Sequence, residues 1–239
     1  IPNYRLLVAH RTGAGKTLSM IRVLSNFYDD PRPKIAIFPE DDVAANFYKS
    51  VMRFENPYRT YVLEKHPELA RIDDLSDGQL DLVVKTLAMH GHPRSAGRPG
   101  FLQAPLRAFS YRQIGGAALQ SMAWFQPKPG CPPTERGSNL YCDKIIVLDE
   151  AHNLIDPNEE KFKHPVSAAN LRHAREALTK AVDTVMVLFT ATPMVKKAKE
   201  DFEALMAIVK GKGNESLSDE GFVSAFYGAP ASAYPKVTP

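Results

Sequence analysis

The sequence predicts an α/β fold, an open and mostly parallel sheet with helices on both faces. Four short apolar runs, at residues 5–9, 34–38, 144–148 and 184–190, are each followed by polar or turn-forming residues. Amphipathic helical patterns lie between these runs, and alternation of buried strands with helices is typical of parallel sheets with crossover connections. The 239 residues are enough to bury a full core.

The first fifty residues alternate two strands with two helices. After the strand at 5–9 we expect a helix at about 16–27, which the segment DDPRP ends. A second buried strand occupies residues 34–38, and an amphipathic helix covers residues 41–53. The side chains placed on one face are Leu18, Ile21, Leu24 and Ser25 in the first helix, and Val43, Phe47, Val51 and Phe54 in the second.

The middle of the chain is less regular. Residues 57–90 have an irregular helical pattern, and residues 91–100 form a basic loop rich in glycine and proline. We expect a strand at 106–111 and a helix at 113–124. The prolines of residues 125–139 predict a long loop.

Regular elements return in the last third. The stretch KIIVLDEAHNLI, residues 144–155, predicts a buried strand followed by a polar turn. A helix at 166–182, the strand of TVMVLFTATP at 184–193 and a helix near 197–210 complete the pattern. We expect residues 1–210 to form one domain, with an irregular insertion at about 57–105, and residues 211–239 to extend towards a further domain. The abrupt start without methionine suggests a piece of a longer chain.

Composition and charge exclude little. Thirty basic residues against 27 acidic ones give a net charge of +3, which permits a nucleic-acid partner without arguing for one. The two cysteines, Cys131 and Cys142, could pair or be isolated buried thiols, and their spacing does not fit a zinc site. Because no run approaches the length of a membrane span, we expect no membrane partner.

The stretch TGAGKT at 12–17 follows the first strand and opens the first helix. Glycines at its second and fourth positions allow backbone N–H groups to point at an anion, and the helix dipole faces the same point. The predicted nucleotide-binding residues are Thr12, Gly13, Ala14, Gly15, Lys16 and Thr17. Lys16 would reach the β- and γ-phosphates of ATP, and the Thr17 hydroxyl would hold Mg²⁺. The usual pattern begins with glycine where this chain has His10, so a glycine-rich turn with a chance lysine is the competing interpretation.

Two further motifs follow buried strands. In VLDEAH, residues 147–152, Asp149 would hold Mg²⁺ and Glu150 would orient and deprotonate the attacking water, with His152 bridging towards the γ-phosphate or the next strand end. Taken alone, such letters usually mark a solvated helix start. TATP, residues 190–193, follows the last strand. The three motifs in this order make a site for ATP with Mg²⁺ the better interpretation, with Lys16, Asp149 and Glu150 as catalytic residues.

Together the motifs resemble those of the first RecA-like domain of superfamily 2 helicases and translocases. HRTGAGKT is similar to motif I, DEAH to motif II and TATP to motif III. The resemblance implies a RecA-like P-loop NTPase fold and ATP hydrolysis coupled to movement along DNA or RNA. It also implies that Thr190 and Thr192 couple the ATP state to nucleic-acid contact, with His152 as their partner.

The resemblance also implies partners. Residues at the loose matches to motifs Ia and Ib would contact the nucleic-acid backbone, namely Pro39, Ser110, Tyr111 and Arg112, although ordinary strand ends are an equal alternative. A second RecA-like domain in the same longer chain would supply the arginine finger, which contributes about 10³–10⁵ in rate in related systems. We therefore expect this chain alone to bind ATP weakly and hydrolyse it poorly.

A finer resemblance links His10 and the tail FYGAPASAYPKVTP to the group of large-DNA-virus proteins similar to the poxvirus early transcription factor small subunit. Swi/Snf-type translocases share much of the pattern. The alternative function is therefore an ATP-dependent switch in a viral transcription initiation factor, with RNA polymerase or transcription factor subunits as partners. A P-loop ATPase without nucleic acid is a third hypothesis. DNA is favoured over RNA, and we expect an intracellular protein, in the nucleus, or in the virion or host cytoplasm if viral.

Overall fold

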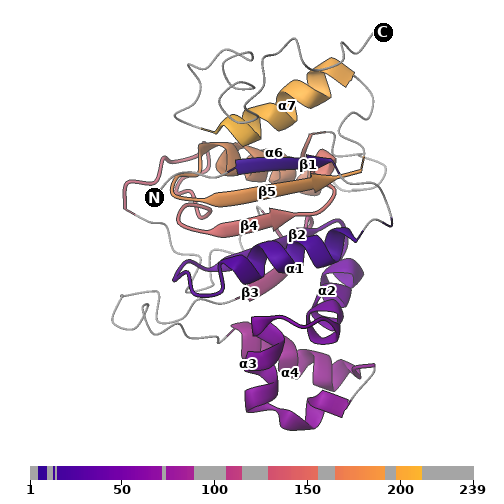
Figure 1. Ribbon diagram of the computed structural model, residues 1–239. Helices are drawn as coiled ribbons and strands as arrows, with labels where there is room; N and C mark the ends of the chain where they lie inside the picture. The colour runs from indigo at the N-terminus through magenta and orange to yellow at the C-terminus, as the bar shows by residue number, and fades with distance from the viewer. Residues whose placement is uncertain are drawn as a thin grey trace, which may run out of the picture.

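The computed structural model describes residues 5–9, 13, 15–71, 74–88, 106–114, 129–155, 165–191 and 198–211. Within these ranges, five parallel strands form one sheet in the order β1-β5-β4-β2-β3 (Figure 1). The strands are β1 (Arg5–Ala9), β2 (Lys34–Phe38), β3 (Leu106–Ser110), β4 (Ile145–Leu148) and β5 (Val185–Thr190). The helices are α1 (Lys16–Asn26), α2 (Asp41–Arg53), α3 (Pro57–Lys65), α4 (Asp77–Ala88), α6 (Pro165–Lys180) and α7 (Ala198–Lys210), with short 3-10 helices η1 (Pro67–Arg71) and η4 (Ala151–Leu154).

Each central strand is buried on both faces. In β4, Ile146 and Leu148 pack into a core with α6, α7 and η4, whereas Ile145 and Val147 pack into a second core with α1, α2, α3 and α4. Successive side chains of a strand point to opposite faces, so an uninterrupted apolar run is what a sheet covered by helices on both faces requires. The α/β fold with an open parallel sheet is therefore confirmed (Figure 1).

The predicted strands, including β3, lie within two residues of their expected bounds, and so do α1, α2, α6 and α7. The irregular helical pattern at 57–90 corresponds to α3, η1 and α4. The loop at 91–100 and most of the expected helix at 113–124 fall outside the described residues. The division at residue 210 stays a prediction.

The predicted face of α2 is confirmed at Phe47 and Val51 and wrong at Val43, which is 37% exposed. The buried residues of α2 are Ala44, Phe47, Tyr48 and Val51. These positions follow the spacing i, i+3, i+4 and i+7, which makes a complete apolar stripe. The sequence prediction missed it because Ala44 and Tyr48 are less apolar than Val43, although the Tyr48 hydroxyl has a partner in the backbone N–H of Ala108 at 2.8 Å. In the described part of the chain, no helix is long and apolar enough to cross a bilayer.

Arg5 ties the edge strand β1 to the ends of two helices. Its guanidinium, in a residue only 5% exposed, donates hydrogen bonds to the carbonyl oxygens of Leu178 at 2.9 Å and Ile208 at 2.6 Å, and also to that of Ala181. Burial lowers the pKa of Arg5 to about 10. The last carbonyls of a helix lack partners within the helix, so this cation caps α6 and α7 and fixes them against β1.

The disulfide between Cys131 and Cys142 decides a question that the sequence left open. Their Cα atoms are 6.0 Å apart, and the bond closes a loop that precedes β4. Inside this loop the Asn139 amide donates to the carbonyl of Ala177 in α6 at 2.7 Å, and Arg136 donates to Asn170 at 2.9 Å. The disulfide thus closes the loop on itself, and the hydrogen bonds of Asn139 and Arg136 fix the loop to α6.

We expect Arg5→Met to lower the free energy of unfolding by about 2–4 kcal/mol, because it removes charge-assisted hydrogen bonds and leaves buried carbonyls without a donor. Urea unfolding followed by circular dichroism measures the change. Arg172→Met is the matched control, since Arg172 is an exposed residue of α6. Equal stability of the two variants would contradict the capping role.

Reduction of the disulfide should lower the free energy of unfolding by about 3 kcal/mol. This is the free energy that corresponds to the loop-closure entropy of a loop of this length. The measurement is urea unfolding with and without dithiothreitol. A Cys131→Ser/Cys142→Ser double variant serves as control and should not respond to the reductant. Coincident curves for the unmodified chain in both buffers would show that the bond adds no stability.

Candidate functional site

The turn between β1 and α1 has the backbone that a phosphate loop needs. Gly13 and Gly15 have φ of +79° and +84°, a left-handed conformation that glycine adopts without strain. Gly15 also stands at the N-cap of α1, where no side chain caps the helix and no acidic residue lies in the first turn. The free N–H groups and positive dipole of this helix end are thus available to an anion. His10, Thr12 and Ala14 lie outside the described residues.

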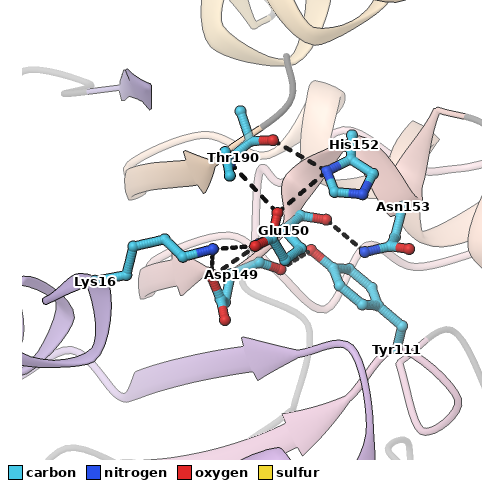
Figure 2. A network of polar contacts seen from close by, with 8 residues as sticks. Lys16, Tyr111, Asp149, Glu150, His152, Asn153 and Thr190 are labelled. Carbon is cyan, nitrogen blue, oxygen red and sulfur yellow. Dashed lines mark hydrogen bonds and ion pairs between the residues drawn. The ribbon is translucent and has the colours of Figure 1, made fainter. Parts of the chain in front are cut away.

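Lys16, the first residue of α1, forms ion pairs with two acidic residues from the end of β4. Its Nζ lies 3.3 Å from Asp149 Oδ1 and also donates to Glu150 Oε1 (Figure 2). Burial lowers the pKa of Lys16, but the hydrogen bond to Glu150 and the charges of both carboxylates outweigh it, so the pKa is raised overall. Burial raises the pKa of Asp149, and Lys16 opposes that change. The structure therefore brings the three predicted catalytic residues into one contact network.

Glu150 occupies a constrained backbone position. Its φ of +50° and ψ of +52° lie in the left-handed region, which residues other than glycine rarely adopt. The Asn153 side chain donates to the Glu150 carbonyl at 2.7 Å, and the Asn153 N–H donates to the same oxygen at 3.0 Å. Asparagine thus holds the turn that aims the Glu150 carboxylate along the strand ends.

His152 joins Glu150 to the end of the neighbouring strand β5. Its Nδ1 lies 3.3 Å from Glu150 Oε2 and 3.0 Å from the Thr190 hydroxyl (Figure 2). The N–H of Ala191 donates to Glu150 Oε2 at 3.4 Å. The predicted partnership of His152 with Thr190 therefore has a direct contact. Thr192, its predicted companion, lies outside the described residues.

The four residues predicted to contact nucleic acid differ in exposure. Arg112 is exposed and Pro39 is half-buried, whereas Ser110 and Tyr111 are completely buried. In this conformation, only Arg112 and Pro39 present side-chain surface to a partner. The nucleic-acid contacts stay a prediction.

Tyr111 has a different position from the one expected. Its hydroxyl donates to the backbone carbonyl of Asp149 at 2.9 Å. Sequence reasoning missed this contact and that of Asn153. The available signal was a tyrosine directly after a buried strand, because a buried hydroxyl needs a hydrogen-bond partner.

The donor set at the strand ends fits Mg²⁺. Asp149 offers a carboxylate that is 13% exposed, and Thr17 adds a hydroxyl in the first turn of α1. Oxygen ligands of this kind, completed by water and phosphate oxygens, are what Mg²⁺ prefers. Thr17 and Asp149 stay the residues predicted to hold the ion.

Comparisons with known proteins bear on the family. Residues 2–195 match the family model described as type III restriction enzyme, res subunit. No curated protein matches the chain. Among solved structures, a leucine-to-valine variant of Dbp5 from S. cerevisiae, bound to RNA and ADP BeF3, is similar with a TM-score of 0.42 and 18% identity. The alignment covers 86% of this chain and only 40% of that one, so this chain corresponds to less than half the length of the matched structure.

The contact between His152 and Thr190 predicts an effect of removing one hydroxyl. For the hydrolysis of ATP that the motifs predict, we expect Thr190→Val to lower the rate by about 3- to 30-fold, the range of typical coupling energies, with little loss of stability because valine suits a strand. Single-turnover hydrolysis of radiolabelled ATP measures the rate. Thr86→Val is the matched control. Thr86 lies on the remote helix α4, and its hydroxyl is 3.0 Å from His66 Nε2. Equal rates for the two variants would contradict a role for the His152–Thr190 contact in hydrolysis.

Proposed function

We propose that this chain is the ATP-binding and ATP-hydrolysing half of a nucleic-acid helicase or translocase. The premise is that the chain belongs to the family described as type III restriction enzyme, res subunit. The family match makes the chain a superfamily 2 helicase domain with a RecA-like fold. Coupling of hydrolysis to movement along DNA or RNA is the further step that we infer.

The observation that carries the proposal is the network in which Lys16 meets both Asp149 and Glu150. It joins the phosphate loop after β1 to the acidic pair after β4, on the one edge of the sheet where ligands of open α/β folds bind. Within this network each residue has a chemical role. Lys16 is a cation poised for phosphate oxygens, Asp149 is a ligand for the Mg²⁺ that would neutralise phosphate charge, and Glu150 is the group that accepts a proton from water.

The contacts of Glu150 with its neighbours support that role. Its Oε2 faces His152 Nδ1 at 3.3 Å and the N–H of Ala191 at 3.4 Å, so the carboxylate is oriented from two elements. Because His152 also contacts Thr190, a shift at the end of β5 would reach Glu150 directly. This connection supports the proposal that hydrolysis of ATP by this chain responds to contacts made at the ends of the strands.

The partner that we propose is nucleic acid, with DNA favoured over RNA, and a second RecA-like domain in the same longer chain. Arg112, exposed beside β3, is available to backbone phosphates, with the salt dependence typical of such contacts. An ATP-dependent switch in a viral transcription initiation factor would use the same site, and no contact of the described residues favours it over a motor. RNA polymerase or transcription factor subunits would be its partners.

We expect Lys16→Ala to weaken binding of ATP with Mg²⁺ at least tenfold, because it removes the charge-assisted contact to phosphate. Glu150→Gln should retain binding and lower hydrolysis by about 10²–10⁴-fold, the usual contribution of a general base. Binding is measured with a fluorescent ATP analogue, and hydrolysis in single turnover with and without single- and double-stranded DNA and RNA.

Two surface variants serve as controls. Lys49→Ala removes an exposed ion pair with Asp74, and Glu68→Gln changes an exposed carboxylate beside His66. Neither should alter binding or hydrolysis. Unchanged binding in Lys16→Ala would overturn the phosphate-loop assignment. A rate that responds to no nucleic acid would instead favour an ATPase of another kind, whereas stimulation without translocation would favour the switch.

A further inference from the structure

Tyr111 connects the end of β3 to the peptide between the two acidic residues of the site. Its backbone N–H donates to the carbonyl of Phe38 at 2.8 Å, which anchors the residue to β2. Its hydroxyl donates to the carbonyl of Asp149 at 2.9 Å (Figure 2). Since β2 lies between β3 and β4 in the sheet, the side chain spans one strand to reach its partner.

The ring of Tyr111 is fixed by packing. The residue is completely buried, in the same core as Ile37, Leu148, Ala151 and Leu154. These neighbours come from β2, β4 and η4, the elements that surround the acidic pair. A closely packed aromatic ring has little freedom to move, so its hydroxyl is a fixed donor. Burial, followed by the charges of Asp149 and Glu150, raises the pKa of Tyr111 well above its ordinary value, and the hydroxyl stays protonated at neutral pH.

The peptide plane that joins Asp149 to Glu150 is thereby held on both sides. Its carbonyl accepts from Tyr111, and its N–H donates to Asp149 Oδ1 at 3.0 Å. Because a peptide is planar, the orientation of this unit sets the direction in which the chain enters Glu150. Glu150 then continues in the left-handed conformation, which persists only where its surroundings determine it.

We propose that Tyr111 is a positioning residue for Glu150, whose hydroxyl holds the Asp149–Glu150 peptide in the orientation that aims the Glu150 carboxylate at the nucleotide site. This inference rests on the proposed function, because the role of Glu150 in hydrolysis belongs to it. It does not require Tyr111 to contact ATP or nucleic acid. The hydroxyl acts through the backbone alone.

Tyr58 is a matched control for Tyr111, because its hydroxyl is also buried but lies away from the site. Tyr58 in α3 is 1% exposed, and its hydroxyl donates to the backbone carbonyl of Leu24 at 3.0 Å. Its acceptor is at the end of α1 opposite to Lys16. Tyr58→Phe and Tyr111→Phe therefore remove the same atom from equally buried rings, and both lose one hydrogen bond to a carbonyl.

The test compares the two variants with the unmodified chain in hydrolysis of ATP with Mg²⁺. In Tyr111→Phe we expect kcat to fall by about 10- to 100-fold, since small misplacements of catalytic groups have effects of this size. The KM and the dissociation constant of the fluorescent ATP analogue should change less than twofold. Tyr58→Phe should leave both kinetic constants unchanged, while the thermal midpoints of the two variants fall by similar amounts. Crystal structures of the unmodified chain and of Tyr111→Phe report the conformation of Glu150.

Equal kcat values for Tyr111→Phe and Tyr58→Phe would overturn the positioning role while leaving the proposed function intact. An unmodified chain that binds no ATP would overturn the proposed function, and with it the aim of the Glu150 carboxylate at a nucleotide site. The two structures would then decide the part of the inference that concerns the backbone of Glu150. It stands if Glu150 leaves its left-handed conformation or its contact with Lys16 in Tyr111→Phe. It fails if both features persist.

Discussion

The ion pairs of Lys16 with Asp149 and Glu150 are the interactions on which the rest of the site depends. They exist because the five strands of the described residues run parallel, so the residues after β1, β4 and β5 meet at one edge of the sheet although they are far apart in the chain. The apolar strands therefore do more than form a core. Their common direction gathers a cation, two carboxylates, a histidine and a hydroxyl within contact distance.

The charges of this network balance only in part, because one cation faces two carboxylates. Asp149 and Glu150 are adjacent and only 13% and 22% exposed, so each carboxylate raises the energy of the other, and Lys16 forms an ion pair with each. Buried charges without a partner are strongly unfavourable. A triphosphate that draws Lys16 towards its own oxygens leaves the carboxylates without a cation. This is a physical reason for a nucleotide to bind at this edge together with a divalent cation.

The elements of the fold and the motifs of the site could be predicted because they depend on local pattern. Apolar runs such as residues 145–148 and the glycines before Lys16 carry their own signal. The local pattern does not identify the partner of a side chain, which is why the contact of the Tyr111 hydroxyl with Asp149 was missed and the pairing of Cys131 with Cys142 was left open. The prediction that Val43 lies on the buried face of α2 was wrong for a related reason. The side of α2 that packs depends on the neighbouring strand β3 rather than on the apolarity of single residues.

Glu150 shows where the backbone preference of a residue conflicts with the role that we propose for its side chain. A φ of +50° favours glycine, and a larger side chain there costs of order 1–3 kcal/mol. Glycine would relieve the strain but would remove the carboxylate that Lys16, His152 and Ala191 contact. The surrounding hydrogen bonds from Tyr111 and Asn153 offset that cost by holding the backbone on both sides of the residue. A strained residue supported in this way marks a position where the side chain, rather than the stability of the turn, determines which amino acid is present.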